Sequence, residues 1–429
     1  MHKNPHIVVV GAGFGGLWAS RALAGKPVDV TLIDDDNYHA FWPLLYQVAA
    51  AELEVEQIAY PVRRILRSMK NVNFALGRVQ EVDFAARCVR TPWQQFDYDY
   101  LVLALGSTPS YFGIHGAQEH TFTLNTLEDG VALRNQILRC YELAVQEQDE
   151  ARRRRLLTFV IVGGGPTGVE YAGALSELIY GPMRKDFRDM GIEQVQIVLV
   201  EMKDTLLPAM PARLGRYALH RLQDRRVQVR LETSVATVSE QDVTFEDGSC
   251  LATETVVWTA GVRGEPLAEA WGLPTGKGGR VPVLPTLQAP DHENVFVVGD
   301  MAAFEGEDGN PLPLLAPVAM QQGEHAARNI LRHIEGQALE PFRYRDRGTL
   351  ATIGRTAAVA HIFGRTFTGF LAWLIWLGVH LVQLIGFRNR LFVLINWAWS
   401  YLFFERMVRL ILPRQQAPDA DDKGNTPHA

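Results

Sequence analysis

Two glycine-rich loops give the clearest chemical signal in this sequence. The first contains Gly11, Gly13 and Gly16 in the spacing G-x-G-x-x-G, with Gly15 as an additional glycine. In this spacing the first glycine makes a tight turn, the second lets the backbone approach a pyrophosphate, and the third lets a helix pack on a strand. The pyrophosphate then lies on the amides of the helix N-terminus, where the helix dipole favours negative charge. Asp34, 23 residues after Gly11, is placed to accept hydrogen bonds from a ribose, so the loop is predicted to bind a dinucleotide.

The second loop contains Gly163, Gly165 and Gly168, and its acid is Glu201. A carboxylate at this place suits a free ribose 2′-hydroxyl and repels a 2′-phosphate, so NADH is expected in preference to NADPH. Glu170 follows the loop closely, and its spacing leaves two interpretations open. It is either an acid placed near the helix N-terminus by the dipole or a residue that acts at the nicotinamide.

Each loop lies within a strand, turn, helix and strand pattern, which starts near Ile7 in the first case and near Phe159 in the second. Three further runs, Tyr100–Gly106, Glu254–Gly261 and Asn294–Asp300, are almost continuously apolar. Such runs are typical of strands that are buried on both faces of a parallel sheet. The predicted fold is therefore α/β, with two Rossmann-like dinucleotide-binding domains.

Composition limits the remaining possibilities. The chain has 429 residues, 21% charged residues and a net charge of −6, which indicates a folded protein of two to three domains and disfavours nucleic-acid binding. Cys88, Cys140 and Cys250 lie far apart without a CxxC spacing, so no disulfide framework, metal site or dithiol centre is predicted. We expect reduced, buried cysteines in a cytoplasmic protein, and no signal peptide because a strand begins at about Ile7.

The C-terminal part of the chain differs in character from the rest. Residues Thr366–Phe387 form a run of 22 without a charge, and a second apolar run covers Leu391–Phe404. A membrane-spanning hairpin would translocate Arg388 and Arg390, against the tendency of positive charges to remain inside. Helices lying in the membrane interface avoid this conflict because each arginine can then reach lipid phosphates. The other arginines before the final polar tail are Arg365, Arg406 and Arg409.

One side of the first apolar run collects Trp373, Trp376, His380 and Gln383 at helical spacing. Because indoles favour the boundary between membrane and water, this side is expected to face the membrane surface, with Trp397 and Trp399 adding to it. The alternative is a helix pair used for dimerisation or for the core.

The run "NVFVVGDMAAF" places Asp300 at the carboxyl end of a strand, where α/β sheets bind ligands. With the two loops, it resembles the flavoprotein reductases with two dinucleotide folds. The resemblance implies that the first loop and Asp300 hold FAD together, and that the second unit is inserted into the first as the NADH domain. The segment "AFWPLLYQVAAAELE" lacks the cysteine pair of disulfide reductases, and the scattered cysteines fit sulfide:quinone oxidoreductases poorly.

A closer resemblance rests on "HAFWPLLYQVA", "VIVGGGPTGVEYAGAL", "APVAMQQGEHAARNI" and "GTLATIGRTAAVA", together with the apolar C-terminus. These segments look like the type II NADH dehydrogenases, single-chain FAD enzymes that oxidise NADH with a membrane quinone and pump no protons. Two alternatives remain: a soluble NADH-dependent flavoprotein reductase of a ferredoxin-like carrier protein, and a membrane-attached NADH-binding redox sensor. The resemblance implies a peripheral location on the cytoplasmic face of the cell membrane. The partners would be quinone and the lipid surface, with a homodimer as an open option.

The quinone-side motif of this family, A-Q-x-A-x-Q, aligns with residues 316–321, where Pro317 replaces the first glutamine. The resemblance places Ala319 and Met320 near the flavin and Gln321 near the quinone headgroup. Glu170 and Gln321 are the predicted catalytic residues. Besides the residues named above, the predicted cofactor-binding residues are Phe14, Pro43, Gln47, Val79, Ala104, Gly106, Pro166, Thr167, Ala260 and Gly261, with Tyr46 beside Gln47 as either a flavin or a core residue.

The expected domains are an FAD-binding domain in two parts, 1–115 and 271–345, and an NADH-binding domain, 116–270. A membrane-associating region with amphipathic helices follows at 346–412, and a disordered tail is expected at 413–429.

Overall fold

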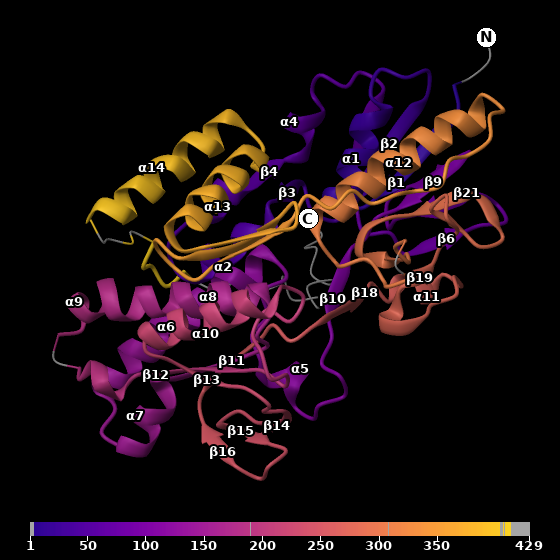
Figure 1. The fold of residues 1–429 in the computed structure, drawn as a ribbon. Coiled ribbons are helices and arrows are strands. Elements are labelled where there is room, and N and C mark those ends of the chain that lie inside the picture. The colour runs from indigo at the N-terminus through magenta and orange to yellow at the C-terminus, as the bar shows by residue number, and fades with distance from the viewer. Residues whose placement is uncertain (1–3, 189, 308, 404–405, 407, 413–429) are drawn as a thin grey trace, which may run out of the picture.

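The computed structural model describes residues 4–412 except positions 189, 308, 404, 405 and 407, so the expected tail 413–429 lies outside the described residues. The described chain is built around two mainly parallel sheets, which are followed by a C-terminal unit (Figure 1). No helix among the described residues is both long enough and apolar enough to cross a bilayer.

The first sheet surrounds the N-terminal loop, and its central strands are almost entirely buried. All neighbouring strands in it are parallel except β20, which pairs antiparallel with β21. Helices α1 (Phe14–Leu23) and α12 (Ala316–Ile334) pack together on one face, and a small antiparallel sheet of β6, β7 and β8 covers the other. The strand order is β20 (Gln288–Ala289), β21 (His292–Val297), β9 (Tyr100–Leu103), β1 (His6–Val10), β2 (Asp29–Asp34) and β5 (Val72–Leu76). The covering strands are β6 (Glu81–Asp83), β7 (Cys88–Arg90) and β8 (Gln95–Asp97).

The second sheet repeats this plan around the second loop, with four strands that are all parallel. Helices α8 (Pro166–Leu178) and α10 (Ala212–Asp224) cover one face, and a three-stranded antiparallel sheet covers the other. The strand order is β13 (Val227–Arg230), β12 (Gln196–Val200), β11 (Thr158–Val162) and β17 (Thr255–Trp258), and the covering strands are β14 (Val235–Val238), β15 (Asp242–Phe245) and β16 (Cys250–Ala252). Helices α6 (Leu127–Gln146) and α7 (Glu150–Leu156) lead into β11.

The chain crosses between the two sheets twice, in adjacent segments. Strand β10 (Ser107–Pro109) leads out of the first unit and pairs antiparallel with β18 (Val262–Gly264), which leads back. The strands of the first sheet lie before residue 104 or after residue 287, whereas those of the second lie between 158 and 258. The second unit is therefore inserted into the first, which confirms the predicted two-domain α/β fold; the exact domain bounds remain predictions.

The C-terminal unit combines a three-stranded antiparallel sheet with two helices, which Figure 1 shows in yellow side by side. Its elements are β23 (Thr349–Thr352), β24 (Ala358–Ile362), β25 (Arg365–Thr368), α13 (Gly369–Gln383) and α14 (Phe387–Phe403). The chain turns between the helices at Gly386, which has a φ of 90°, and a Cβ there would come within 2.4 Å of the Tyr60 ring. A side chain at this position is therefore excluded by both backbone and space.

The prediction that the indole side faces the membrane surface is wrong. Trp373, Trp376 and Trp397 are 7%, 1% and 2% exposed and pack into the protein, as does His380, whereas Trp399 is 44% exposed. Buried indoles need a hydrogen-bond acceptor for the N–H group, and the protein body supplies acceptors for Trp376 and Trp397. The outer face instead carries aliphatic and phenyl side chains: Phe370, Leu371, Leu374 and Val382 of α13, and Leu391, Phe392, Leu394, Ile395, Leu402 and Phe403 of α14.

Two smaller expectations also need correction. Cys88 and Cys140 are buried as expected, but Cys250 is exposed, because it lies on the small antiparallel sheet that covers the second unit. The expectation that every C-terminal arginine reaches lipid phosphates is wrong for Arg406, which is buried among polar partners. Arg390 also has hydrogen-bond partners within the protein. It donates to the carbonyl oxygens of Val382 and Leu384 near the end of α13, at 2.7 Å each.

Candidate active site between the nucleotide loops and the C-terminal helices

The two glycine loops have the same local geometry. The first glycine of each, Gly11 and Gly163, has a positive φ and donates its amide to the carbonyl of the neighbouring strand at 2.8 Å. A Cβ on the third glycine, Gly16 or Gly168, would lie 1.8 or 1.9 Å from the carbonyl oxygen of the first. Both third glycines are therefore fixed by sterics, because each helix starts in contact with its own turn.

The second glycine of each loop faces open space. A Cβ on Gly13 or Gly165 would meet no atom within 4 Å, and neither α1 nor α8 has a side-chain cap or an acid in its first turn. The amides at these helix N-termini are thus available to an anion, with room for it above the second glycine. This arrangement fits the pyrophosphate of a dinucleotide in both units.

The two acids hold their loops in matching ways. Asp34 accepts hydrogen bonds from the amide of Ala12 and, at 2.8 Å, from that of Asp36. Glu201 accepts from the amide of Gly164 at 2.6 Å and from that of Lys203 at 2.9 Å. Each carboxylate thus braces the turn after its own strand while lying where a ribose is expected. Burial raises the pKa of Asp34 to about 7.

A small cavity of about 120 Å³ extends from Asp34 along the end of the first sheet. The predicted residue Val79 lines it, together with Arg78 and Glu265, which sequence reasoning missed. Their lining of a cavity next to a nucleotide loop suits the adenosine part of a dinucleotide. Neither residue belongs to a motif, so only the folded chain identifies them.

The Gly-Asp segment lies against the first loop, and the role of Asp300 in FAD binding remains a prediction. Asp300 accepts a hydrogen bond from the hydroxyl of Ser107 at 2.8 Å, and burial raises its pKa. The neighbouring Gly299 donates its amide to the side-chain oxygen of Gln322 at 2.7 Å. A Cβ on Gly15 would come within 3.0 Å of Val298. The first loop, the Gly-Asp segment and α12 therefore converge at one site.

The two adjacent glutamines of α12, Gln321 and Gln322, point to different partners. Gln322 is fully buried and holds Gly299, a role that sequence reasoning missed. Gln321 instead exchanges two hydrogen bonds of 3.0 Å with the backbone of Arg345, so its placement near a quinone headgroup remains a prediction. Pro317 lies in the first turn of α12, where a missing N–H costs no helical hydrogen bond, which makes this replacement compatible with the helix.

Glu170 is buried in α8, beyond the first turn of the helix. Its Oε1 accepts hydrogen bonds from the indole N–H of Trp376 and from the amide of Thr352, both at 3.1 Å. Burial raises the pKa of Glu170 to about 8, against the lowering effect of these two donors. Glu170 therefore connects the NADH unit to α13.

A second indole contact connects α14 to the first unit. The N–H of Trp397 donates to Oε1 of Gln47 at 2.9 Å, and the amide of Gln47 donates to the hydroxyl of Tyr46 at 2.9 Å. Trp376 stacks on His380 with ring centroids 4.1 Å apart and lies 5.7 Å from Trp397. Burial lowers the pKa of His380 to about 4, so this aromatic cluster is uncharged at neutral pH.

The remaining predicted residues belong to several elements of the two units. Ala319 and Met320 are nearly buried at the start of α12, and Tyr46 and Gln47 lie in helix α2 (Leu45–Ala49). Phe14, Pro166 and Thr167 begin α1 and α8, Pro43 lies in a short 3₁₀ turn before α2, Ala104 and Gly106 follow β9, and Ala260 and Gly261 follow β17. A Cβ on Gly163 would lie 2.7 Å from the Cα of Ala260, so these two loops touch.

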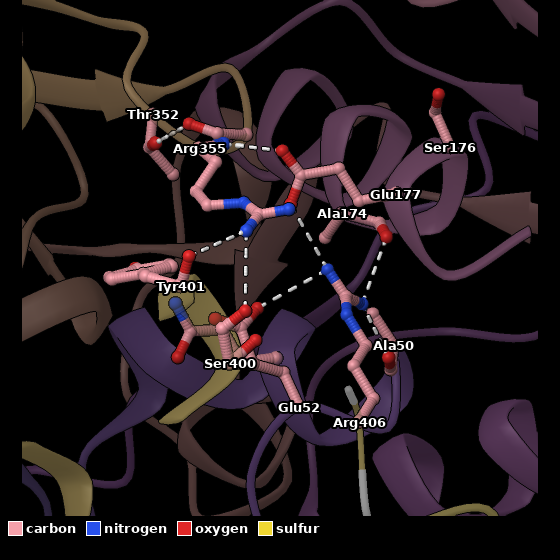
Figure 2. A network of polar contacts seen from close by, with 12 residues as sticks. Ala50, Glu52, Ala174, Ser176, Glu177, Thr352, Arg355, Ser400, Tyr401 and Arg406 are labelled. Atoms are coloured by element: carbon pink, nitrogen blue, oxygen red, sulfur yellow. Dashed lines mark hydrogen bonds and ion pairs between the residues drawn. The ribbon is translucent and has the colours of Figure 1, made fainter. Parts of the chain in front are cut away.

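A buried polar cluster fixes the C-terminal segment to both units (Figure 2). Arg406 donates to the carbonyls of Ala50 and Ala174 at 2.6 and 3.0 Å, and pairs with Glu52 and Glu177 at 3.5 and 3.2 Å. Ala50 and Glu52 belong to the first unit, whereas Ala174 and Glu177 lie on α8 of the second. Arg406, which follows α14 in the chain, therefore contacts both nucleotide-binding units.

Comparison with known proteins agrees with this architecture. The family model described as pyridine nucleotide-disulphide oxidoreductase matches residues 5–323, and the model described as NDH2 C-terminal domain matches residues 347–406. A solved structure of NDH2 from Plasmodium falciparum in complex with NADH has the same fold. Its TM-score is 0.87 at 18% identity, covering 96% of this chain and all of that one. These matches define the class, an oxidoreductase built from two dinucleotide-binding domains.

Relatives with clear sequence similarity narrow the class. The type II NADH:quinone oxidoreductase Ndh of Mycobacterium tuberculosis is 39% identical, covering 97% of this chain and 92% of its own length. A type II NADH:quinone oxidoreductase of Staphylococcus haemolyticus is 33% identical, covering 85% and 91%. The chain therefore belongs to the type II NADH:quinone oxidoreductases. This membership confirms the expected enzyme class and its cofactors, FAD and NADH.

Proposed function

We propose that this chain oxidises NADH with a membrane quinone while attached to the cytoplasmic face of the cell membrane, without pumping protons. FAD, when bound, supplies the two-electron chemistry that joins NADH to the quinone. The observation that supports this most directly is the two-sided C-terminal helix pair. Its outer face is apolar, and its inner face donates hydrogen bonds to Glu170 and Gln47 from the two nucleotide-binding units.

The two glycine loops divide the cofactors between them. The first loop, with Asp34 and the Gly-Asp segment at Asp300, would hold the pyrophosphate and ribose of FAD. The second loop would hold NADH, with Glu201 accepting hydrogen bonds from the adenosine ribose. Because the Glu201 carboxylate would repel a 2′-phosphate, this placement favours NADH over NADPH.

Glu170 would hold a proton close to the quinone site. Its pKa of about 8 keeps the carboxyl group protonated at neutral pH, and Oε1 accepts both hydrogen bonds, which leaves Oε2 to bear the proton. A buried carboxyl group with a pKa near the working pH is suited to proton transfer. Gln321 would contribute to quinone binding only after its two hydrogen bonds with Arg345 open.

The membrane surface would be contacted by the outer face of α13 and α14. Leu394 is 49% exposed and Leu402 is 72% exposed, and Arg388 lies next to this face over the Phe392 ring at 5.2 Å. An interfacial helix pair of this kind binds through buried apolar area together with attraction to lipid phosphates. A quinone dissolved in the bilayer would then reach the aromatic cluster from the lipid side. A homodimer remains a prediction.

The test measures NADH oxidation by the purified, FAD-loaded protein, with a long-tailed quinone in vesicles and with a water-soluble quinone. Leu394→Glu should remove about 1.5–3 kcal/mol of apolar contact, and so weaken vesicle binding about ten-fold or more. Its rate with the water-soluble quinone should not change. Leu284→Glu is the matched control, since Leu284 is 44% exposed before β20 on the first unit and should keep full vesicle binding. Activity with a ferredoxin but with no quinone would favour the alternative carrier-protein reductase and refute the proposal.

A further inference from the structure

A pocket of about 580 Å³ lies beside the apolar helix face, away from both glycine loops. It forms where the end of α8, the end of α10 and the turn at Arg355 meet the start of α13 and the end of α14. Ser176, Glu177, Arg355 and Tyr401, which line one side of it, are visible in Figure 2. None of the residues assigned above to FAD, NADH or quinone lines this pocket, and its lining indicates a different ligand.

Arginines make up one part of the lining of this pocket. Its described lining includes four arginines, at positions 184, 225, 226 and 355, but only two acids. Both acids are already paired: Glu177 with Arg225 and Arg406, and Asp224 with Arg221. Arg184 and Arg226 form no ion pair with any residue that the structure describes. The buried Nε of Arg225 also has no hydrogen-bond partner in the described chain. The cationic groups of this lining therefore outnumber the acids available to pair with them.

The backbone places these arginines in a defined way. Helix α8 continues as a π-helix over Ile179–Met183, which puts Tyr180 and Gly181 at the pocket. Arg226 follows the end of α10 with a φ of 61°, a left-handed conformation, and its guanidinium lies 5.1 Å from the centre of the Tyr180 ring. π-Helices and left-handed non-glycine residues are both concentrated at functional sites. Arg226 is thus a positioned cation rather than a freely moving one.

The other part of the pocket is aromatic and continues onto the outer helix face. Phe370, Trp373 and Tyr401 line it, and Phe370 is 57% exposed next to Leu371, which is 55% exposed. Leu402, 72% exposed, follows Tyr401 on α14. A ligand that fits both parts must carry an anionic group for the arginines and an apolar chain for the aromatic side.

We propose that this pocket binds the phosphate-bearing headgroup of an anionic phospholipid, with Arg184 and Arg226 at the phosphate and an acyl chain along Phe370. The inference rests on the proposed membrane docking and adds a specific lipid site to it. Arginine suits phosphate because its planar fork of N–H donors binds two oxygens at once. A free phosphate ion would satisfy the arginines but leave the aromatic side without a partner.

The test is cosedimentation of the FAD-loaded full chain with vesicles of phosphatidylcholine alone or with added phosphatidylglycerol. The double variant Arg184→Gln/Arg226→Gln is compared with the control Arg152→Gln/Arg154→Gln. The control removes two arginines from α7, which Figure 1 places at the end of the molecule away from α13 and α14. One arginine at an anionic surface strengthens binding about five-fold, so the pocket variant should lose roughly thirty-fold on phosphatidylglycerol vesicles. The control should lose little.

Folding is checked independently by flavin absorbance and by the rate with a water-soluble quinone, which both double variants should retain. The proposed lipid site is refuted if wild type binds both kinds of vesicle equally, or if the two double variants lose affinity equally. Either result leaves the proposed membrane docking unaffected. If wild type binds neither kind, the docking proposal fails and this inference with it. Sodium phosphate at constant ionic strength should not compete with the vesicles. Loss of the phosphatidylglycerol preference in phosphate would show that the pocket takes free phosphate and would overturn the lipid assignment.

Discussion

Replacing Arg406 by methionine should destabilise the whole protein, because Arg406 is the cation between two acids in a buried cluster (Figure 2). Methionine keeps the apolar stem but removes the hydrogen bonds to Ala50 and Ala174 and leaves Glu52 and Glu177 without this partner. Breaking a buried ion pair from one side costs about 3–5 kcal/mol. For 429 residues the unfolding entropy is about 0.9 kcal/mol/K, so Tm should fall by about 3–6 °C.

Thermal unfolding followed by tryptophan fluorescence measures this change, and Arg409→Met is the matched control. Arg409 pairs with Asp186 at 2.8 Å, but both side chains are partly exposed, at 28% and 41%. Exposed pairs contribute about 0–1 kcal/mol, so the control should lower Tm by about 1 °C or less. Equal losses in the two variants would refute the argument from burial.

The dependence on pH gives a second check of the same reasoning. Burial raises the pKa of Glu52 already in the wild type, and Arg406 is the largest influence that opposes this. Without Arg406 the pKa of Glu52 should rise further. Protonation of Glu52 at lower pH should then remove more of the free-energy cost of burying its charge. A carboxyl group with a raised folded pKa favours folding below its unfolded value, and this contribution is lost as pH rises through the folded pKa. The deficit of Arg406→Met should therefore be smaller at pH 5.5 than at pH 8, and adding Glu52→Gln should recover part of it. A deficit that does not change with pH would contradict the role assigned to Glu52.

Three further predictions concern the nucleotide loops and the buried acid. Glu201→Gln should lower the ratio of kcat/KM for NADH to that for NADPH about ten-fold or more, since a charged hydrogen bond contributes about 1.5–3 kcal/mol; an unchanged ratio in steady-state kinetics would remove the ribose assignment. Glu170→Gln should become more stable relative to wild type as pH rises from about 5 to 9, because the wild-type carboxyl group, with its pKa raised to about 8, loses its stabilising contribution over this range. Parallel Tm curves of the two proteins would contradict this burial effect. Gly168→Ala, whose Cβ would lie 1.9 Å from the carbonyl oxygen of Gly163, should raise the KM for NADH at least ten-fold while the flavin absorbance is retained. Equal loss of both cofactors would show that the two loops do not act separately.

Local sterics explain why the glycine loops could be predicted from the sequence. The requirement for glycine at Gly16 and Gly168 comes from the carbonyl of a residue only five positions earlier, so the spacing alone encodes the contact. The two predicted acids lie at corresponding places, since Asp34 ends β2 and Glu201 directly follows β12, even though Glu201 is farther from its loop in the sequence. Their hydrogen bonds to the loop amides were not predicted, because spacing does not show how a strand end faces its neighbouring turn.

The C-terminal helices show the limit of periodicity as evidence. The pattern correctly grouped Trp373, Trp376 and His380 on one side of α13, but it could not tell which side is buried against the protein. The deciding contacts join Trp376 to a residue 206 positions away and Trp397 to one 350 positions away. Only the folded chain reveals acceptors at such separations, and the same holds for the partners of Arg406.

The polar cluster around Arg406 also bears on how substrates enter. Strands β10 and β18 connect the two nucleotide-binding units. If these two strands were flexible, the units could move apart from each other. Arg406 forms hydrogen bonds to both units at a separate place, and these bonds oppose such a movement. We therefore expect NADH and its oxidised product to exchange by local movement of loops and side chains, while the two units keep their relative positions.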